Sequence, residues 1–210
     1  MSGSDLASVL AGARVVPVLT VPSAASAGPL AEALAAGGAR CAEVTFRTAD
    51  AERVVKAMAA HGGLAVGAGT VLDPEQAERA VAAGASFVVS PGLDEDVIAK
   101  CRELGVPVVP GIATATELMR ALRAGLDTVK LFPAEAVGGL RVLRSLAAPF
   151  PGVRFMPTGG IGPAQLADYL GEPSVLAVGG SWMATPAHLE AGAYAEIGRL
   201  TAEAVHGSST

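Results

Sequence analysis

The sequence predicts a single (β/α)₈ barrel that spans residues 1–210 and begins with a short helix. Short apolar segments rich in Val, Ile and Leu alternate with Ala-rich helical segments along the whole chain. The unit of helix, glycine and strand recurs about eight times at intervals of roughly twenty residues, with no linker or break in composition. Continuous apolar strands separated by helices are typical of a parallel sheet covered by helices, and eight such units favour closure into a barrel.

Eight segments have the apolar, β-type composition that the barrel strands require. They are residues 14–20, 40–46, 64–67, 86–90, 106–109, 127–132, 153–157 and 174–178. The main alternative is an open, doubly wound sheet. Its expected dinucleotide motif is weak, because residues 67–72 (GAGTVL) lack the third glycine. We therefore predict the closed barrel.

Helical segments lie between these strands and carry start and stop signals. They are predicted near 29–36, 49–60, 74–83, 95–104, 114–124, 138–147 and 163–170, and a last helix runs from about 190 to 205. Ser4 can cap a short helix before the first strand. Asp73 followed by Pro74, and Asp94, are helix starts, whereas Gly84 and Gly105 are helix ends.

Composition and charge exclude several classes of protein. The formal net charge is −5 and no basic block occurs, which argues against nucleic-acid binding. The cysteines and histidines have no metal-ligand spacing, so we expect no metal site; they are Cys41, Cys101, His61, His188 and His206. Residues 1–13 lack the basic segment and the apolar run of a signal peptide, so we expect none there, and no apolar run reaches the roughly 18 residues that span a membrane. A cytoplasmic protein without membrane contact is expected.

Residues 127–132 place a lysine inside the predicted barrel. Alternation turns Val129 and Leu131 toward the helices, and Thr128, Lys130 and Phe132 toward the interior. A buried lysine is costly unless it is neutral or paired, and desolvation favours the neutral amine, which is a nucleophile. The alternative is a solvated lysine on an edge strand, but a closed barrel has no edge strand.

Residues 40–47 bring an acid, a hydroxyl and a guanidinium toward the mouth of the barrel. Glu43 and Thr45 point inward, and Arg47 follows at the end of the strand. A simple ion pair between Glu43 and Arg47 on the rim is equally compatible with this pattern. Beside an inward lysine, however, a carboxyl group suits proton transfer and a guanidinium suits a substrate carboxylate.

Two glycine-rich turns are predicted after the last two strands. Residues 157–162 are PTGGIG and residues 178–182 are VGGSW. The backbone N–H groups of such turns can surround an anion, and a helix N-terminus adds a favourable dipole. Because the loops after strands seven and eight are the recurrent phosphate site of this fold, we expect a small phosphorylated ligand.

Together these residues resemble the family of 2-keto-3-deoxy-6-phosphogluconate aldolases, which often are also 4-hydroxy-2-oxoglutarate aldolases. The motifs that carry the resemblance cover nearly the whole chain in order. They are VPV at 16–18, EVTFRT at 43–48, VGAGTV at 66–71, SPG at 90–92, PGI at 110–112, KLFPAE at 130–135, PTGGI at 157–161 and GGSW at 179–182.

The resemblance implies a role for each candidate residue. It makes Lys130 the Schiff-base lysine and Glu43 the general acid and base, and it places Arg47 and Thr70 at the pyruvate carboxylate. The other implied substrate-binding residues are Pro91, Phe132 beside the imine, Thr158 for stereochemistry, and Gly159, Gly160, Gly180 and Ser181 for the phosphate. The family implies a cytoplasmic homotrimer that binds a keto-acid phosphate and needs no metal or other cofactor beyond the Schiff base.

The sequence therefore predicts a class I, metal-independent aldolase that cleaves 2-keto-3-deoxy-6-phosphogluconate to pyruvate and glyceraldehyde 3-phosphate, the aldol step of the Entner–Doudoroff pathway. One alternative is the same chemistry on the galacto epimer or on an unphosphorylated 4-hydroxy-2-oxo acid. Another is a non-catalytic barrel that binds sugar phosphates, which would leave the inward acid and lysine unexplained.

Overall fold

Parallel strands form a ring in the computed structural model, which describes residues 6–10 and 12–207. The strands are β1 (Val15–Leu19), β2 (Cys41–Thr45), β3 (Ala65–Gly69), β4 (Phe87–Val89), β5 (Val108–Val109), β6 (Gly111–Ile112), β7 (Thr128–Leu131), β8 (Arg154–Phe155) and β9 (Val178–Gly180). Pro110 alone separates β5 from β6, so these two short strands occupy one position and the ring has eight. The predicted number of barrel strands is confirmed.

Two hydrogen-bonded sheets meet to close the ring. One sheet has the order β5-β4-β3-β2-β1-β9, and the other has the order β6-β7-β8. At the first junction, the Lys130 N–H donates to the carbonyl of Pro110 at 2.9 Å. At the second, Thr158 pairs with Gly179 in a parallel bridge, and the Gly179 N–H donates to the carbonyl of Pro157 at 2.9 Å. The closed barrel is therefore observed in place of an open, doubly wound sheet.

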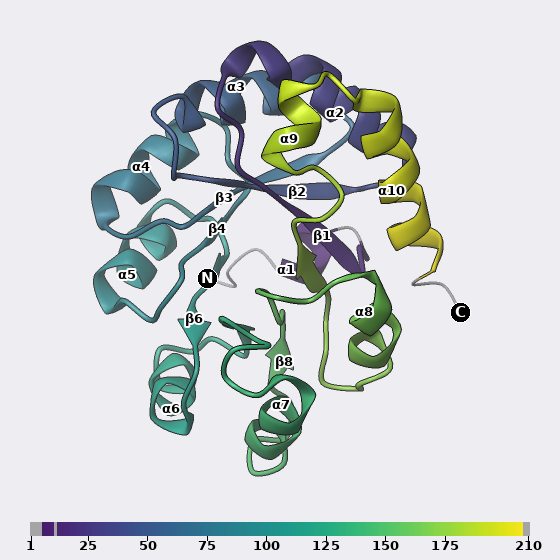
Figure 1. The fold of residues 1–210 in the computed structure, drawn as a ribbon. Helices are drawn as coiled ribbons and strands as arrows, with labels where there is room; N and C mark the ends of the chain where they lie inside the picture. Colours follow the sequence, from purple (N-terminus) through teal and green to yellow (C-terminus); the bar gives the residue numbers. More distant parts are fainter. Residues whose placement is uncertain (1–5, 11, 208–210) are drawn as a thin grey trace.

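Helices surround the strands in chain order from α2 to α8, and α10 completes the circle between α8 and α2 (Figure 1). They are α1 (Leu6–Val9), α2 (Ala27–Ala36) preceded by the short 3₁₀ helix η1 (Ala24–Ser26), α3 (Ala51–His61), α4 (Pro74–Ala82), α5 (Glu95–Glu103), α6 (Ala115–Arg123), α7 (Gly139–Ala147), α8 (Pro163–Leu170), α9 (Pro186–Glu190) and α10 (Tyr194–His206). The predicted caps are present, because the side chains of Asp73 and Asp94 accept hydrogen bonds from the N–H groups of Gln76 and Val97.

The end of the described chain differs from the prediction by one short helix. The helix expected from about 190 to 205 is α10, which begins later, at Tyr194, and α9 (Pro186–Glu190) before it was not predicted. Gly192, with a positive φ of 62°, lies between the two helices. The helix expected before the first strand is α1, whereas its predicted cap, Ser4, lies outside the described residues.

The eighth barrel strand lies further along the chain than residues 174–178. Its paired residues are Val178–Gly180, and Val175 makes only an isolated bridge to Phe155. Gly179 and Gly180 pair with Val16 and Pro17 of β1, so they belong to the strand and not to a turn after it. The prediction was wrong because glycine in a strand normally signals a turn, whereas here the missing side chains make room for neighbours.

Apolar residues fill the interior of the barrel at the end where the strands begin. Leu6, the first residue of α1, and Leu10, which follows that helix, pack in one buried cluster with Cys41 and Phe87, the first residues of β2 and β4. The segment around α1 therefore closes this end. The opposite end, where the strands finish, is the mouth of the barrel and is the end at which polar side chains are expected. No helix among the described residues combines the length and apolar character needed to cross a membrane.

The barrel interior depends on a glycine in β3. A Cβ atom added at Gly67 would lie 2.2 Å from a ring carbon of Phe87, which is fully buried. We therefore expect Gly67→Ala to lower the free energy of unfolding by about 1–3 kcal/mol, because the ring cannot move without displacing the core. Urea denaturation measures this change.

The matched control is Gly28→Ala, which adds the same methyl group to α2. No atom lies within 4 Å of the Cβ that it adds. Alanine is the better helix former, whereas Pro29 disfavours the helical conformation for a preceding residue with a Cβ atom, so stability should change by less than about 1 kcal/mol in either direction. Equal effects of the two substitutions would refute the close packing of Phe87 against β3.

Candidate active site

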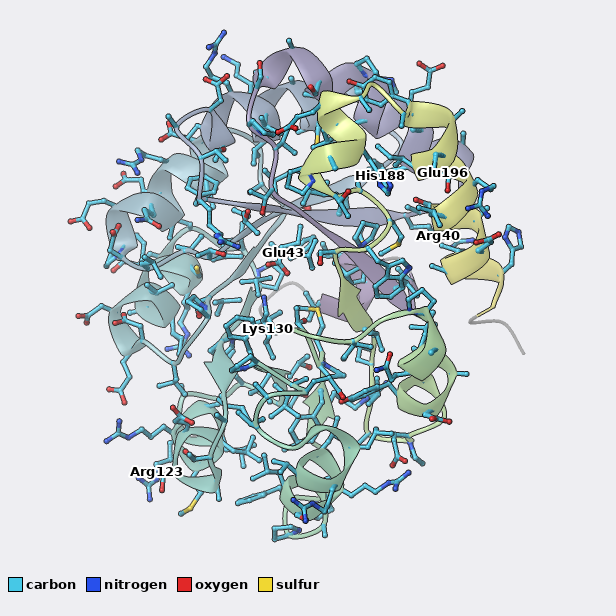
Figure 2. The ribbon with its side chains drawn as sticks, viewed as in Figure 1. Arg40, Glu43, Arg123, Lys130, His188 and Glu196 are labelled. Atoms are coloured by element: carbon cyan, nitrogen blue, oxygen red, sulfur yellow. The ribbon has the colours of Figure 1, made fainter. Side chains whose placement is uncertain are left out.

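Lys130 and Glu43 meet inside the barrel from opposite sides of the ring. Lys130 lies on β7 and Glu43 on β2, and three strand positions separate these strands in either direction. Lys130 Nζ donates to Glu43 Oε1 at 3.1 Å. Figure 2 shows the two labelled side chains pointing toward one another. The alternative ion pair between Glu43 and Arg47 is absent from the described residues, because Glu43 is paired with the lysine.

This pair is deeply buried, since Lys130 is 4% exposed and Glu43 is 0% exposed. They are the buried charged residues in the part of the chain that the structure describes. Taking two charges out of water costs several kcal/mol for each ion, and a well-packed apolar pair of the same volume would be at least as stable. A buried pair at the mouth end of a barrel therefore indicates a functional site and not a contribution to the stability of the fold.

Glu43 has an oxygen that is free to act on another molecule. Its Oε2 atom is buried and has no hydrogen-bond partner among the described residues. Gly69 of β3 makes room for the carboxyl group, because a Cβ atom there would lie 2.1 Å from Glu43 Oε1. No role for Gly69 was predicted from the sequence. The signal that could have found it is a glycine inside a strand, which often marks a close approach by another group.

Phe132 contacts Lys130, and Arg47 follows the strand that carries Glu43. The Phe132 ring centroid is 5.1 Å from Lys130 Nζ, within the distance for a cation–π contact. Arg47 is exposed, two residues beyond the end of β2, and makes no ion pair with the other described residues. The inward hydroxyl of Thr45 donates to the carbonyl of Leu19 at 3.0 Å, so it holds β1 against β2 at the mouth.

Thr70 has a strained backbone immediately after β3. Its φ is +57°, and among the described residues it alone has a positive φ without being glycine. A β-branched residue in this region costs about 1–3 kcal/mol, so the surroundings must impose it. They do so on both sides, since Gly69 accepts a hydrogen bond from the Phe46 N–H at 2.7 Å and the Val71 N–H donates to Val89 at 3.2 Å. Strain of this kind is concentrated at functional sites.

A glycine turn follows β8, the strand next to β7, at the mouth of the barrel. Thr158 is buried and fits against Gly179, where a Cβ atom would lie 2.2 Å from Thr158 Oγ1. Gly159 and Gly160 follow with positive φ values of 103° and 82°. The N–H groups of Gly160 and Ser181 donate to no other residue in the described ranges, so both can donate to an anion.

The remaining predicted site residues lie on the same rim. Pro91 follows β4, and its carbonyl oxygen would be 2.1 Å from a Cβ atom at Gly111 of β6. Gly180 is the last residue of β9 and makes room for Trp182, whose ring would lie 2.0 Å from a Cβ at that position. Ser181 is exposed. The structure therefore gathers every predicted site residue at the mouth.

Both cysteine side chains are fully buried. Burial, reinforced by the Glu43 charge, raises the pKa of the Cys41 thiol to about 12, and burial raises the pKa of Cys101 to about 11. Both thiols are free. No group of three or more His, Cys, Asp or Glu residues that could hold a metal ion occurs in the described ranges 6–10 and 12–207.

Known proteins resemble this chain over nearly its whole length. A family model described as "KDPG and KHG aldolase" matches residues 6–200. The 2-dehydro-3-deoxy-phosphogluconate aldolase of Treponema pallidum is 50% identical over 189 residues, which cover 90% of each chain. The structure of the 2-keto-3-deoxy-6-phosphogluconate aldolase of Zymomonas mobilis ZM4 with 3-phosphoglycerate is 44% identical, with a TM-score of 0.92 over 97% of this chain and 96% of that one.

A further relative was solved with a trapped reaction intermediate. The KDPG aldolase from Legionella pneumophila, with pyruvate captured at low pH as a covalent carbinolamine intermediate, is 36% identical to this chain. It has a TM-score of 0.92 and covers 96% of this chain and 98% of its own.

Both thiols should be inert in the folded protein. At pH 8, which is below both raised pKa values, only about 10⁻⁴ to 10⁻³ of each group is thiolate, and neither side chain is accessible. We expect no reaction with Ellman's reagent within minutes in the native protein, and two thiols per chain in denaturant. One rapidly reacting thiol in the folded protein would contradict the burial of Cys41 or Cys101.

Proposed function

The chain belongs to the family of KDPG and KHG aldolases, and from this membership we propose that it cleaves 2-keto-3-deoxy-6-phosphogluconate (KDPG) to pyruvate and glyceraldehyde 3-phosphate. This reaction is the aldol cleavage of the Entner–Doudoroff pathway, and the enzyme is a lyase. The observation that carries the proposal is the 3.1 Å contact between Lys130 Nζ and Glu43 Oε1. It joins a nucleophilic amine to an acid that can move its protons.

Lys130 forms the Schiff base. A proton passes from its ammonium to Glu43 along the existing hydrogen bond, which neutralises both buried charges. The free amine then attacks the C2 ketone, a C–N bond forms, and a proton passes from the attacking nitrogen to the carbonyl oxygen, which gives a neutral carbinolamine. Glu43 returns its proton to the resulting hydroxyl, which leaves as water. The product is an iminium ion, and the Phe132 ring near Nζ stabilises its positive charge.

Glu43 then moves protons for the bond cleavage. Its carboxylate takes the proton of the C4 hydroxyl, directly or through a water molecule. The C3–C4 bond breaks, its electron pair neutralises the iminium to an enamine, and glyceraldehyde 3-phosphate leaves. Glu43 next gives that proton to C3 of the enamine. Water hydrolyses the new iminium, which releases pyruvate and restores the ammonium of Lys130.

The other rim residues bind the two ends of the substrate. Arg47, without an ion-pair partner in the described chain, and the strained Thr70 hold the pyruvate carboxylate. Pro91 and Phe132 line the reacting carbons. Thr158 selects the stereochemistry beside the reacting bond. The phosphate binds between the two glycine segments, through the four remaining residues Gly159, Gly160, Gly180 and Ser181.

The Schiff base supplies the electron sink, so the proposed reaction needs no metal ion. We also propose that residues 1–210 form one aldolase domain and that the enzyme is a cytoplasmic homotrimer whose partner is a small keto-acid phosphate. The oligomeric state and the location rest on the family resemblance of the sequence, and the single domain rests on the unbroken alternation of helix and strand.

Release of pyruvate, coupled to lactate dehydrogenase, tests the proposal directly. We expect kcat/KM to be highest for KDPG, because the glycine turn can bind its phosphate, and lower for the galacto epimer and for unphosphorylated 4-hydroxy-2-oxoglutarate. A higher value for the epimer would reassign the substrate. No turnover of any keto acid would favour the non-catalytic sugar-phosphate-binding barrel.

Lys130 should be the residue that borohydride traps with pyruvate. We expect inactivation with one reduced pyruvate per chain, located on Lys130 by peptide mapping. Lys130→Ala should abolish both trapping and cleavage. The chain offers two matched controls, since its other lysines are Lys56 and Lys100.

Neither control lysine should react near neutral pH. Lys56 is exposed on α3. Lys100 on α5 donates to Glu103 at 2.9 Å, and this hydrogen bond raises the pKa of Lys100, so its amine stays protonated. Lys56→Ala and Lys100→Ala should keep full activity. An adduct on either residue, or pyruvate release by Lys130→Ala, would overturn the mechanism.

Glu43→Gln should keep the fold and slow proton transfer. The amide has the shape of the carboxyl group but cannot titrate, so we expect kcat to fall by about 10²–10⁴-fold. Circular dichroism checks the fold, and Glu52→Gln, at an exposed position on α3, controls for loss of a carboxylate. Activity near the wild-type level in a folded Glu43→Gln protein would refute its role as acid and base.

A further inference from the structure

A hydrogen bond between Tyr169 and Glu135 lies behind the glycine turn and has no part in the chemistry above. Tyr169 is on α8 and is 1% exposed. Glu135 belongs to the loop that leads from β7 to α7. The Tyr169 hydroxyl donates to Glu135 Oε1. A buried phenol normally has a partner, so the bond satisfies the tyrosine, but it also fixes where the Glu135 side chain lies.

The backbone of this loop is bonded directly to the glycine turn. The Ala134 N–H donates to the carbonyl of Thr158 at 2.8 Å, and the Glu135 N–H donates to the carbonyl of Gly159 at 3.0 Å. The two segments therefore lie side by side. A displacement of Glu135 would be transmitted to Gly159 through a hydrogen bond that both segments share.

Side-chain packing couples Glu135 to the same turn. A Cβ atom added at Gly160 would lie 2.8 Å from the Cβ of Glu135, so only the bare glycine leaves room for this side chain. On its other side, a Cβ atom at Gly139 would lie 2.9 Å from Glu135 Oε1 and 3.2 Å from the Tyr169 hydroxyl. Glu135 is exposed to solvent, but its side chain lies between the turn, the start of α7 and the tyrosine that donates to it.

The charge of Glu135 makes its position important. A carboxylate beside a turn that binds a phosphate dianion would repel the ligand. The bond from Tyr169 directs the carboxylate toward Gly139, the first residue of α7, where a negative charge is favourable. Burial and the bond to Glu135 raise the pKa of Tyr169, so its hydroxyl remains a donor at neutral pH.

We propose that the Tyr169–Glu135 hydrogen bond is a positioning device for phosphate binding, which sets the Gly159–Gly160 turn and keeps the Glu135 carboxylate away from the substrate phosphate. The inference deepens the proposed function and rests on it. Tyr169 and Glu135 are positioning residues, because they act through the turn. Their loss should affect the phosphorylated end of the substrate and leave the Schiff-base chemistry at Lys130 intact.

Tyr169→Phe tests the device by removing one hydroxyl. We expect KM for KDPG to rise about 5- to 20-fold, because the carboxylate loses its donor, while kcat stays within about twofold. KM for unphosphorylated 4-hydroxy-2-oxoglutarate and the rate of borohydride trapping of pyruvate on Lys130 should not change. Inorganic phosphate should raise the Tm of the unmodified protein more than that of the variant.

Two further variants separate positioning from a structural role. Glu135→Gln keeps an oxygen that can accept from Tyr169 and removes the charge, so KM for KDPG should stay near the wild-type value. Adding Glu135→Gln to Tyr169→Phe should recover part of the loss, because no free carboxylate then faces the phosphate. The matched control is Tyr194→Phe, which alters the second tyrosine of the chain, on α10.

The outcomes distinguish this inference from the proposed function. An unchanged KM for KDPG in Tyr169→Phe, or an equal rise for both substrates with a lowered Tm, would overturn the positioning role. If the unmodified protein neither cleaves KDPG nor is trapped by borohydride with pyruvate, the proposed function itself fails. A selective rise for the phosphorylated substrate, with trapping intact, supports both.

Discussion

Lys130 and Glu43 are two charges held out of water inside the barrel, and each would cost several kcal/mol there without the other. Because β7 and β2 face each other across the ring, the pair can form only when the barrel is closed. Closure in turn rests on the junction at Pro110, where β7 bonds to the break between β5 and β6, and on the bridge between Thr158 and Gly179. The ion pair that carries the proposed chemistry therefore depends on closure of the barrel.

Missing side chains shape the mouth as much as the polar groups do. Gly69 leaves space for the carboxyl group of Glu43, Gly179 for the hydroxyl of Thr158, and Gly160 for the side chain of Glu135. In each case a functional or positioning group occupies the volume that a Cβ atom would take. The rigid strands thus bring backbone and side chains closer than ordinary residues allow, which places reactive groups with little freedom to move.

Several features were predictable because they follow from local pattern. The eight strand positions follow from apolar segments separated by helices, and the inward direction of Lys130 and Glu43 follows from alternation along each strand. The limits of the last strand and the short helix α9 were not predicted. A glycine lies at each place, and its effect depends on its neighbours. Gly179 fits a strand because Thr158 fills the space beside it, and Gly192, with a positive φ, lies between α9 and α10.

The sequence by itself determined the barrel class and the set of residues at the strand ends, since period and strand order are local properties that hold in any closed barrel. Only the tertiary structure decided which of those residues meet. Glu43 pairs with Lys130 and not with Arg47. Tyr169 donates a hydrogen bond to Glu135, a residue of the motif at 130–135 for which no role was predicted. Such contacts join residues that lie 34 and 87 positions apart. Their choice depends on distances across the closed ring and between packed elements, which no local pattern encodes.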